Sequence, residues 1–338
     1  GLKGETTMSA NINEVNGKAA MFFTGEVPWH GLGQKLPAVA TAAEAIAAAG
    51  LDWKVTKEAI FLKDGTRIPR QYATVRSDTK QALGVVGEVY NPLQNKEAFS
   101  FFDAIVGTKE AIYHTAGALG DGERIWLLAK LPGYIRIIGD DVAEKYLLLT
   151  NTHNGTTTAD VLFTPTRVVC QNTLNIALSD GVRRQKVRHT KKLGLKVADV
   201  RRGLGIINER FEQFELQARA LTGIKFNQEA LDNYFKAIGL LPSTDAELAN
   251  QSTRAKNIIE EVSARFVKGK GNDLPGVKGT AWAAFNAVAE YVDYARTTRG
   301  GGDDLQERLS SRASSLLFGS GAILKQKAWD AAMDLVQA

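Results

Sequence analysis

The chain has 338 residues, 44% of them apolar, and 42 basic against 37 acidic side chains, a globular composition that excludes disordered, collagen-like and coiled-coil proteins. Cys170 is the single cysteine, which excludes an intramolecular disulfide framework and a cysteine-based zinc site. No run of about 18 apolar residues and no secretory signal pattern occurs, so we expect a cytoplasmic protein without a membrane segment.

The first hundred residues predict a short helix followed by antiparallel strands. Residues 1–20 are expected to be a leader or tail, in part derived from a tag, and Trp29 to be exposed in a loop rich in Gly and Pro. Residues 41–49 predict a helix with Thr41 as N-cap, Glu44 completing a capping box, and Gly50 at its end. Asp64-Gly65 predicts a hairpin turn between strand-like runs at 53–56 and 59–62 and a strand at 72–76, and residues 83–87 continue this pattern.

A second block rich in strands follows a helix predicted at residues 95–106. Strands are expected at 113–117, 124–130, 135–138, 144–150 and 159–164, with turns at Gly120-Asp121-Gly122 and Pro132-Gly133 and a polar loop at 151–158. A helix is expected to open at 167–177. After about residue 197 the apolar period becomes helical, over 200–214, 258–266, 282–292 and 322–336.

These elements predict an α+β fold in two domains. Residues 21–190 would form a sheet-rich domain with an antiparallel or mixed sheet and a basic β-arm, and residues 191–338 a mainly helical domain. The strands do not alternate with helices, so a doubly wound parallel sheet is not expected.

The positive charge is concentrated in one segment. Residues 183–202, here called the basic segment, hold nine basic side chains and one acid, a balance of +8, while the remaining residues hold 33 basic and 36 acidic groups and sum to −3. Such asymmetry indicates a polyanion-binding surface, although a solvated basic loop or helix face is the alternative. The first part of the segment suits a β-ribbon arm, and the candidate nucleic-acid contacts are Arg183, Arg184, Lys186, Arg188, His189, Lys191 and Lys192.

A polar constellation at 150–158 and 164–174 is a second candidate. His153, Arg167 and Asn172 could converge on a phosphate together with backbone N–H groups. The alternative is that these side chains only satisfy turns and caps. Aromatic candidates for base stacking are Trp29, Tyr72, Tyr90, Tyr113 and Trp126, of which Trp29 is expected to be exposed.

Enzymatic chemistry finds little support in the sequence. The four histidines have no metal-ligand spacing, and no phosphate-binding loop of the G-x-x-x-x-G-K-[ST] type is present. A nucleophilic pair of Cys170 with His153 or His189 is conceivable, but a lone cysteine beside an apolar residue is more often a small buried hydrophobe. We therefore expect no catalytic residue, metal or cofactor.

Several motifs together resemble a family of unknown function called phage/plasmid-like proteins, carried by bacteriophages, prophages and plasmids. They lie at residues 27–33, 149–155, 163–174, 188–190, 279–288 and 317–322 and read VPWHGLG, LTNTHNG, FTPTRVVCQNTL, RHT, GTAWAAFNAV and LFGSGA. Asn154 stands where the resemblance leads us to expect Asp. The resemblance implies a mobile-element protein and leaves its activity open, and the plan is similar to that of phage single-strand annealing proteins.

The sequence thus predicts a cytoplasmic protein of a bacterial host cell that binds single-stranded DNA as a homo-oligomer, in phage recombination or replication. Two alternatives stay open. One is an oligomeric interaction protein that does not bind DNA. The other is an enzyme of nucleic-acid metabolism that uses His153 and Arg167.

Overall fold

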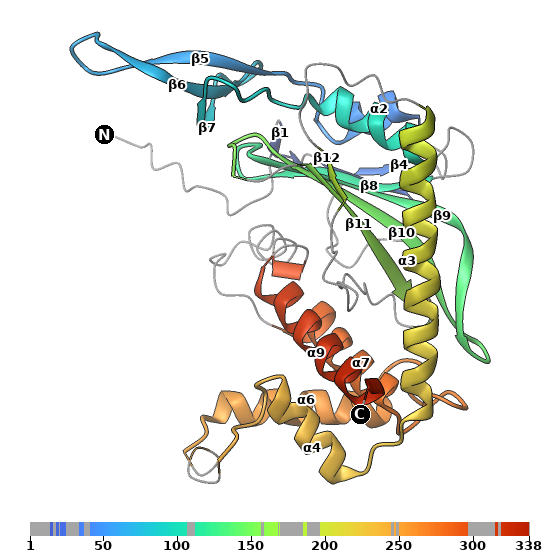
Figure 1. Cartoon of the computed structure of the whole chain (residues 1–338). Coiled ribbons are helices and arrows are strands. Elements are labelled where there is room, and N and C mark those ends of the chain that lie inside the picture. The colour runs from blue at the N-terminus through green and yellow to red at the C-terminus, as the bar shows by residue number, and fades with distance from the viewer. Residues whose placement is uncertain are drawn as a thin grey trace.

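The structure is a computed structural model of the whole chain. It describes residues 14–15, 18–19, 21–24, 34–36, 41–106, 112–156, 159–167, 169, 185–187, 197–244, 247, 250–296, 315–316 and 319–337. Antiparallel strands dominate the first half of the chain and helices the second (Figure 1), which confirms the predicted α+β class.

A seven-stranded sheet forms the centre of the first half. Its order is β12-β11-β10-β9-β8-β3-β4, and every neighbouring pair is antiparallel except β3 with β4. The strands are β3 (Met21–Thr24), β4 (Gln34–Leu36), β8 (Ile112–Leu119), β9 (Arg124–Ile138), β10 (Asp141–Thr152), β11 (Ala159–Arg167) and β12 (Gln185–Val187). A separate short pair, β1 (Glu14–Val15) and β2 (Lys18–Ala19), precedes them.

Two local predictions in this sheet are wrong. Pro132 and Gly133 lie inside the long strand β9, at a point where its register against β10 shifts between Glu144 and Tyr146. Such a bulge accommodates a residue without an N–H and a glycine with φ of 81°. Arg167, expected to open a helix, is instead the last residue of β11.

A second, three-stranded sheet contains β5 (Val55–Phe61), β6 (Arg67–Arg76) and β7 (Ala82–Gly87). Its first two strands form a long hairpin, here called the β5–β6 ribbon (residues 55–76), which extends away from the main sheet (Figure 1). The turn falls at Asp64-Gly65, as the sequence predicted, and Gly65 has φ of 86°. An αL glycine in a short hairpin loop gives the chain the twist that the flanking strands require.

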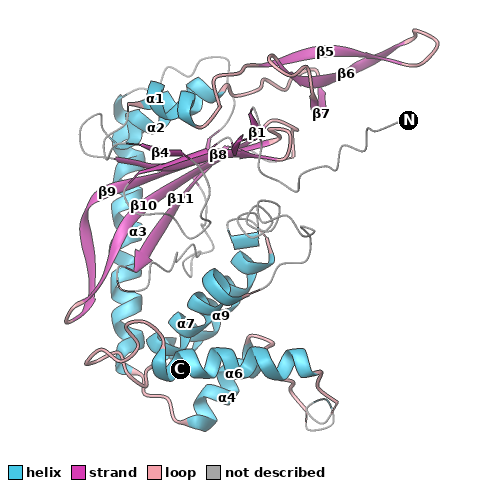
Figure 2. Cartoon of the chain, turned by 180° about the vertical axis from the view of Figure 1, so that it is seen from behind, coloured by secondary structure: helices cyan, strands magenta, loops and turns pink. Residues whose placement is uncertain are grey.

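Helices α1 (Ala42–Ala48) and α2 (Asn95–Val106) lie beside the main sheet, near the end from which the ribbon extends (Figure 2). The predicted capping box is present, because Thr41 Oγ1 accepts the Glu44 N–H and the Glu44 carboxylate accepts the Thr41 N–H. Gly50 follows with φ of 61°. Local side-chain chemistry therefore sets the bounds of α1, as expected from its sequence.

The long helix α3 (Val197–Gly223) joins the two halves of the molecule. It contacts β9 and β11 of the sheet and also α7 (Ala281–Glu290) and α9 (Ser320–Gln337). Phe214 packs against Phe163 of the sheet and against Trp282 and Trp329 of the helices. The remaining elements of the second half are α4 (Gln228–Ala237), α6 (Thr253–Lys268) and the π-helix η1 (Tyr291–Ala295).

One cluster of buried apolar residues runs from Ala45 in the first half to Met333 in the second. The sheet-rich and helical parts therefore share buried side chains across α3. Within the described residues, no helix has both the length and the apolar character needed to cross a membrane.

Candidate nucleic-acid interface

Two stretches of the basic segment are described: residues 185–187, which form an edge strand of the main sheet, and residues 197–202, which begin α3. Strand β12 is the edge strand, and Lys186 pairs in register with Asp160 of β11. The segment then leads to the first turn of α3, which begins at Val197. The other candidate contacts lie outside the described residues: Trp29, Asn172, Arg183, Arg184, Arg188, His189, Lys191 and Lys192.

His153, by contrast, is fully buried at the end of β10. Its Nε2 is 2.9 Å from Asn95 Oδ1, and Asn95 Nδ2 donates to the Leu51 carbonyl at 3.0 Å. The imidazole also meets the Trp53 ring edge-on, with 5.3 Å between ring centroids. These contacts join β10 to α2 and to the start of β5, so in this structure the side chain is not available to a phosphate.

The polar loop after His153 packs against the root of the β5–β6 ribbon. A Cβ added to Gly84 of β7 would lie 2.7 Å from Asn154 Cα, and one added to Gly155 would lie 2.8 Å from Val86 Cγ1. The Tyr90 hydroxyl donates to the Thr152 carbonyl at 3.1 Å. The loop thus holds the small sheet by close backbone approach, which agrees with the turn-and-cap alternative for this part of the constellation.

Arg76, the last residue of β6, also fastens the ribbon to the body of the protein. Its side chain is 1% exposed and its guanidinium lies 4.3 Å from the centroid of the Trp53 ring. Nε and Nη2 donate to the Asp78 carboxylate at 3.0 and 2.7 Å, and Nη1 donates to the Asp121 carbonyl at 2.7 Å. A planar guanidinium can use its donors and its π face at once, which a lysine could not do.

Arg167 is likewise buried, at the junction of the sheet and the helices. It makes a bidentate ion pair with the fully buried Asp141, at 2.7 and 2.9 Å. Its remaining donors reach the Gly271 carbonyl at 2.7 Å and Asn272 Oδ1 at 3.1 Å, and Trp282 Nε1 donates to Asp141 at 2.8 Å. The guanidinium therefore binds the segment before α7 to the sheet, and it faces no solvent-open surface in this arrangement.

The structure thus does not bring His153 and Arg167 together at one site. Each has its own set of protein partners, and neither side chain reaches solvent. Of the aromatic candidates, Tyr113 and Trp126 are buried as well, whereas Tyr72 and Tyr90 are partly exposed. Candidate contacts with a large ligand must therefore be sought among exposed groups.

One exposed surface that the sequence prediction did not select is the outer part of the β5–β6 ribbon. Residues 60–70 contain three basic side chains and one acidic one, around an exposed Phe61 and Leu62. Tyr72, which the sequence did mark as a stacking candidate, lies at the inner end of this surface, where Arg67 Cζ is 5.7 Å and Lys57 Nζ 4.7 Å from its ring centroid. The spacing of lysine and arginine around this hairpin was the signal available in the sequence.

A partly buried polar cluster spans β8, β9 and β10. The Glu144 carboxylate accepts from Lys130 Nζ at 2.5 Å and from the Tyr146 hydroxyl at 2.9 Å, and the His114 ring lies edge-on to Tyr146. Burial lowers the pKa of His114 to about 4, against the opposing effect of the Glu144 carboxylate, and burial raises the pKa of Tyr146. At neutral pH His114 is therefore uncharged and adds nothing to the attraction of an anion.

A cavity of about 810 Å³ lies between α1 and α2 near the start of β5. Ile46, Leu51 and Trp53 contribute apolar side chains to its wall. Two lysines, Lys54 and Lys96, and two acids, Asp52 and Glu97, also line it. Because these charges balance, the cavity does not select an anionic ligand, and we leave it out of the candidate interface.

Comparison with known proteins adds a family and no activity. A family model described as "Domain of unknown function (DUF932)" matches residues 82–316, more than half of the chain. No curated protein and no solved structure matches the chain. The function must therefore be inferred from the charges and contacts of the chain itself.

Proposed function

We propose that this chain, which belongs to the DUF932 family, binds single-stranded DNA through the basic segment. We further propose that it does so as a homo-oligomer in recombination or replication of a phage or plasmid, in the cytoplasm of a bacterial host. An annealing protein must hold many strand contacts in one register, and multiple linked sites convert weak contacts into tight binding.

The observation that carries the proposal is the position of the charge along the chain. The basic segment has a balance of +8 while the rest of the protein sums to −3. A phosphate backbone is attracted to such a segment and repelled weakly by the remaining surface, which favours one orientation of the strand. Each phosphate neutralised by Lys or Arg also releases counterions, so binding should depend strongly on salt.

Support also comes from where the segment lies. Strand β12 is at the edge of the main sheet, and α3 begins ten residues after the strand ends. The proposed contacts are therefore Arg183, Arg184, Lys186, Arg188, Lys191 and Lys192. Arg167 and His153 are left out of this set because protein groups already occupy their donors in the interior.

The proposal is tested by replacing Arg183, Arg184, Lys186 and Arg188 with Ala in the full chain. Binding of a fluorescein-labelled 30-nucleotide single strand is measured by anisotropy at 50 and 200 mM salt. Each phosphate contact contributes about 0.7 to the slope of log K against log salt for a single strand. The loss of four contacts should therefore make the ratio of wild-type affinity to variant affinity about fiftyfold larger at 50 mM than at 200 mM salt.

A matched control removes the same charge from exposed lysines of the helical part: Lys225, Lys236, Lys256 and Lys278, each replaced by Ala. This control should bind as the wild type does. If the basic-segment variant keeps both the wild-type affinity and its salt dependence, the proposal is wrong. If the wild type forms an oligomer whose size and stability do not change when the oligonucleotide is added, the alternative of an interaction protein that does not bind DNA is favoured.

A further inference from the structure

Among the described residues, no third strand pairs with the outer half of the β5–β6 ribbon. β7 pairs with β6 only from Gln71 to Val75, so the residues of β6 before Gln71 pair with β5 alone. Figures 1 and 2 both show this part extending away from the main sheet and the helices. An isolated two-stranded hairpin is marginally stable in water, so a docked partner would add the contacts that this one lacks.

The tip has a defined shape. The Leu62 N–H donates to the Thr66 carbonyl at 2.8 Å, and the Gly65 N–H donates back to Leu62 at 2.9 Å. The Asp64 carboxylate accepts the Thr66 N–H at 2.8 Å, a bond that lowers the pKa of Asp64. A three-residue loop therefore presents the side chains before and after it in a fixed relation.

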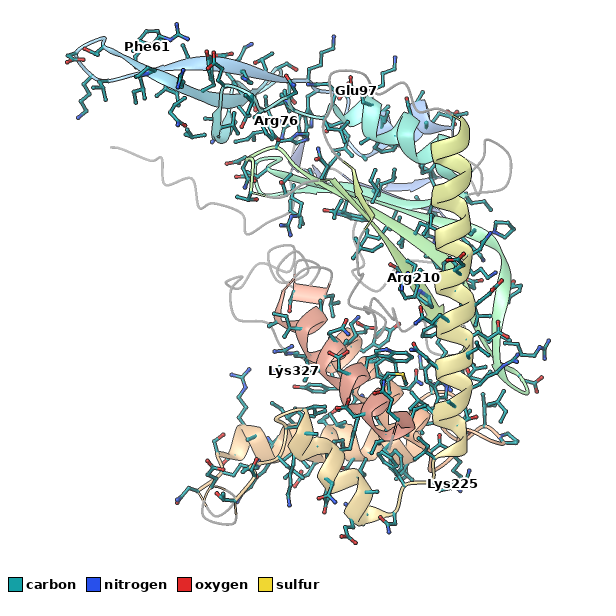
Figure 3. The ribbon with its side chains drawn as sticks, in the orientation of Figure 1. Phe61, Arg76, Glu97, Arg210, Lys225 and Lys327 are labelled. Carbon is teal, nitrogen blue, oxygen red and sulfur yellow. The ribbon has the colours of Figure 1, made fainter. Side chains whose placement is uncertain are left out.

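The side chains at the tip combine positive charge with exposed apolar surface. Phe61 is 58% and Leu62 53% exposed, and Phe61 lies near the outer end of the ribbon (Figure 3). Phe61 is opposite Arg67 in the strand register. Three basic residues outnumber one acid between positions 60 and 70: Lys63, Arg67 and Arg70 against Asp64. Arg70 Nε also lies 3.8 Å from the Glu88 carboxylate, and both of these side chains are largely exposed.

The root of the ribbon, in contrast to its outer half, packs against the body of the protein. The buried Arg76 stacks on Trp53, and the close approach of Gly84 to Asn154 leaves no room for a methyl group. Figure 3 places Arg76 where the ribbon meets the rest of the molecule. These contacts fix the point at which the ribbon leaves the body of the protein.

We propose that the β5–β6 ribbon enters a groove of duplex DNA, a second nucleic-acid contact separate from the basic segment. The major groove, about 12 Å wide, admits a two-stranded β-ribbon. The basic side chains would lie along the phosphates on its rims, while Phe61 and Leu62 make apolar contacts inside the groove, for example with thymine methyl groups. The inference rests on the proposed DNA-binding function and adds the product of annealing as a ligand.

Charge favours DNA over a second copy of the chain as the occupant. In a symmetric contact between two ribbons, each would present the same excess of Lys and Arg to the other. Like charges placed opposite each other in paired strands are destabilising. A polyanion such as DNA is instead attracted by the same lysine and arginine side chains.

The test measures binding of a labelled 20-base-pair duplex and of one of its strands by anisotropy at 50 and 200 mM salt. The first variant replaces Lys63, Arg67 and Arg70 with Ala. Each phosphate contact contributes about 0.9 to the slope of log K against log salt for duplex DNA. The loss of three contacts should therefore make the ratio of wild-type affinity to variant affinity about fortyfold larger at 50 mM than at 200 mM salt.

A second variant, Phe61→Ala with Leu62→Ala, removes apolar surface and no charge. It should weaken duplex binding at both salt concentrations by a similar factor and leave the slope unchanged. A control with Lys225, Lys236 and Lys256 replaced by Ala removes the same charge from the helical part and should bind as the wild type. Because all of these side chains are exposed, each variant should keep the wild-type thermal midpoint.

Three results would overturn the inference. The first is that the ribbon variants bind duplex as tightly as the wild type does. The second is that they lose the same affinity for single strand as for duplex. The third is that the apolar variant forms a smaller oligomer, which would make the ribbon a contact between subunits. The two proposals fail separately. The proposal of single-strand binding is tested by the basic-segment variant, and the ribbon proposal by the ribbon variants. A wild-type chain that binds neither single strand nor duplex would refute both.

Discussion

Replacing Arg167 with Met should strongly destabilise the protein. The Arg167 and Asp141 side chains are both 0% exposed, and the guanidinium donates to Asp141, Gly271 and Asn272. Met has a comparable length and no donor, so it would leave a buried carboxylate whose remaining described partner is Trp282 Nε1. Removing one member of a buried ion pair costs about 3–5 kcal/mol in the free energy of unfolding.

This loss can be read as a thermal shift. At about 2 °C per kcal/mol for a chain of this size, Arg167→Met should lower the midpoint of unfolding by roughly 6–10 °C. The measurement is calorimetric or by circular dichroism on wild type and variant in parallel. Urea titration gives the same difference as a change in the free energy of unfolding.

A double-mutant cycle identifies the cause of the loss. Asp141→Asn in the Arg167→Met background removes the uncompensated charge, so the double variant should be more stable than the sum of the single losses predicts, by about 1–3 kcal/mol. Additive losses, or an Arg167→Met midpoint within 2 °C of the wild type, would refute the assignment of Arg167 as the bond between sheet and helices.

Two further predictions concern His114 and the root of the ribbon. Burial lowers the pKa of His114 from 6.5 to about 4, so the unfolded chain takes up this proton first and stability should fall as the pH drops from 6.5 towards 4; an NMR titration of the imidazole with a midpoint near 6.5 would contradict it. Gly84→Ala places a methyl group 2.7 Å from Asn154 Cα and should cost about 1–3 kcal/mol, with faster hydrogen exchange in β6 and β7. Gly87→Ala, which meets nothing within 4 Å, is the control, and equal effects of the two substitutions would contradict the close packing at Gly84.

Local signals in the sequence predicted much of the secondary structure. Thr41, Glu44 and Gly50 bound α1 because a cap is formed by neighbouring residues, and Asp64-Gly65 marks the turn because an αL glycine is a local requirement. Pro132-Gly133 failed as a turn signal. The same two residues are compatible with a bulge when a neighbouring strand supplies the pairing, and no local pattern reports that neighbour.

The candidate site was harder to predict than the fold. His153 and Arg167 were chosen because a His and an Arg in a polar stretch can bind a phosphate. Both are buried with protein acceptors or donors, the role such residues take when a fold must satisfy its interior. The sequence predicted the hairpin turn of the ribbon but not the exposure of its outer half. That exposure depends on which other strands pair with the ribbon.

The sequence by itself determined the α+β class, the caps of α1, the hairpin turn and the concentration of positive charge in residues 183–202, because periodicity, turn chemistry and charge are properties of neighbouring residues. Only the tertiary structure decided that Arg167 joins the sheet to the helices, that the loop after His153 packs against the small sheet, and that Phe61 and its basic neighbours are exposed to solvent. Burial and exposure depend on contacts between residues up to 141 positions apart, as for Asp141 and Trp282. No local pattern in the chain specifies such pairs.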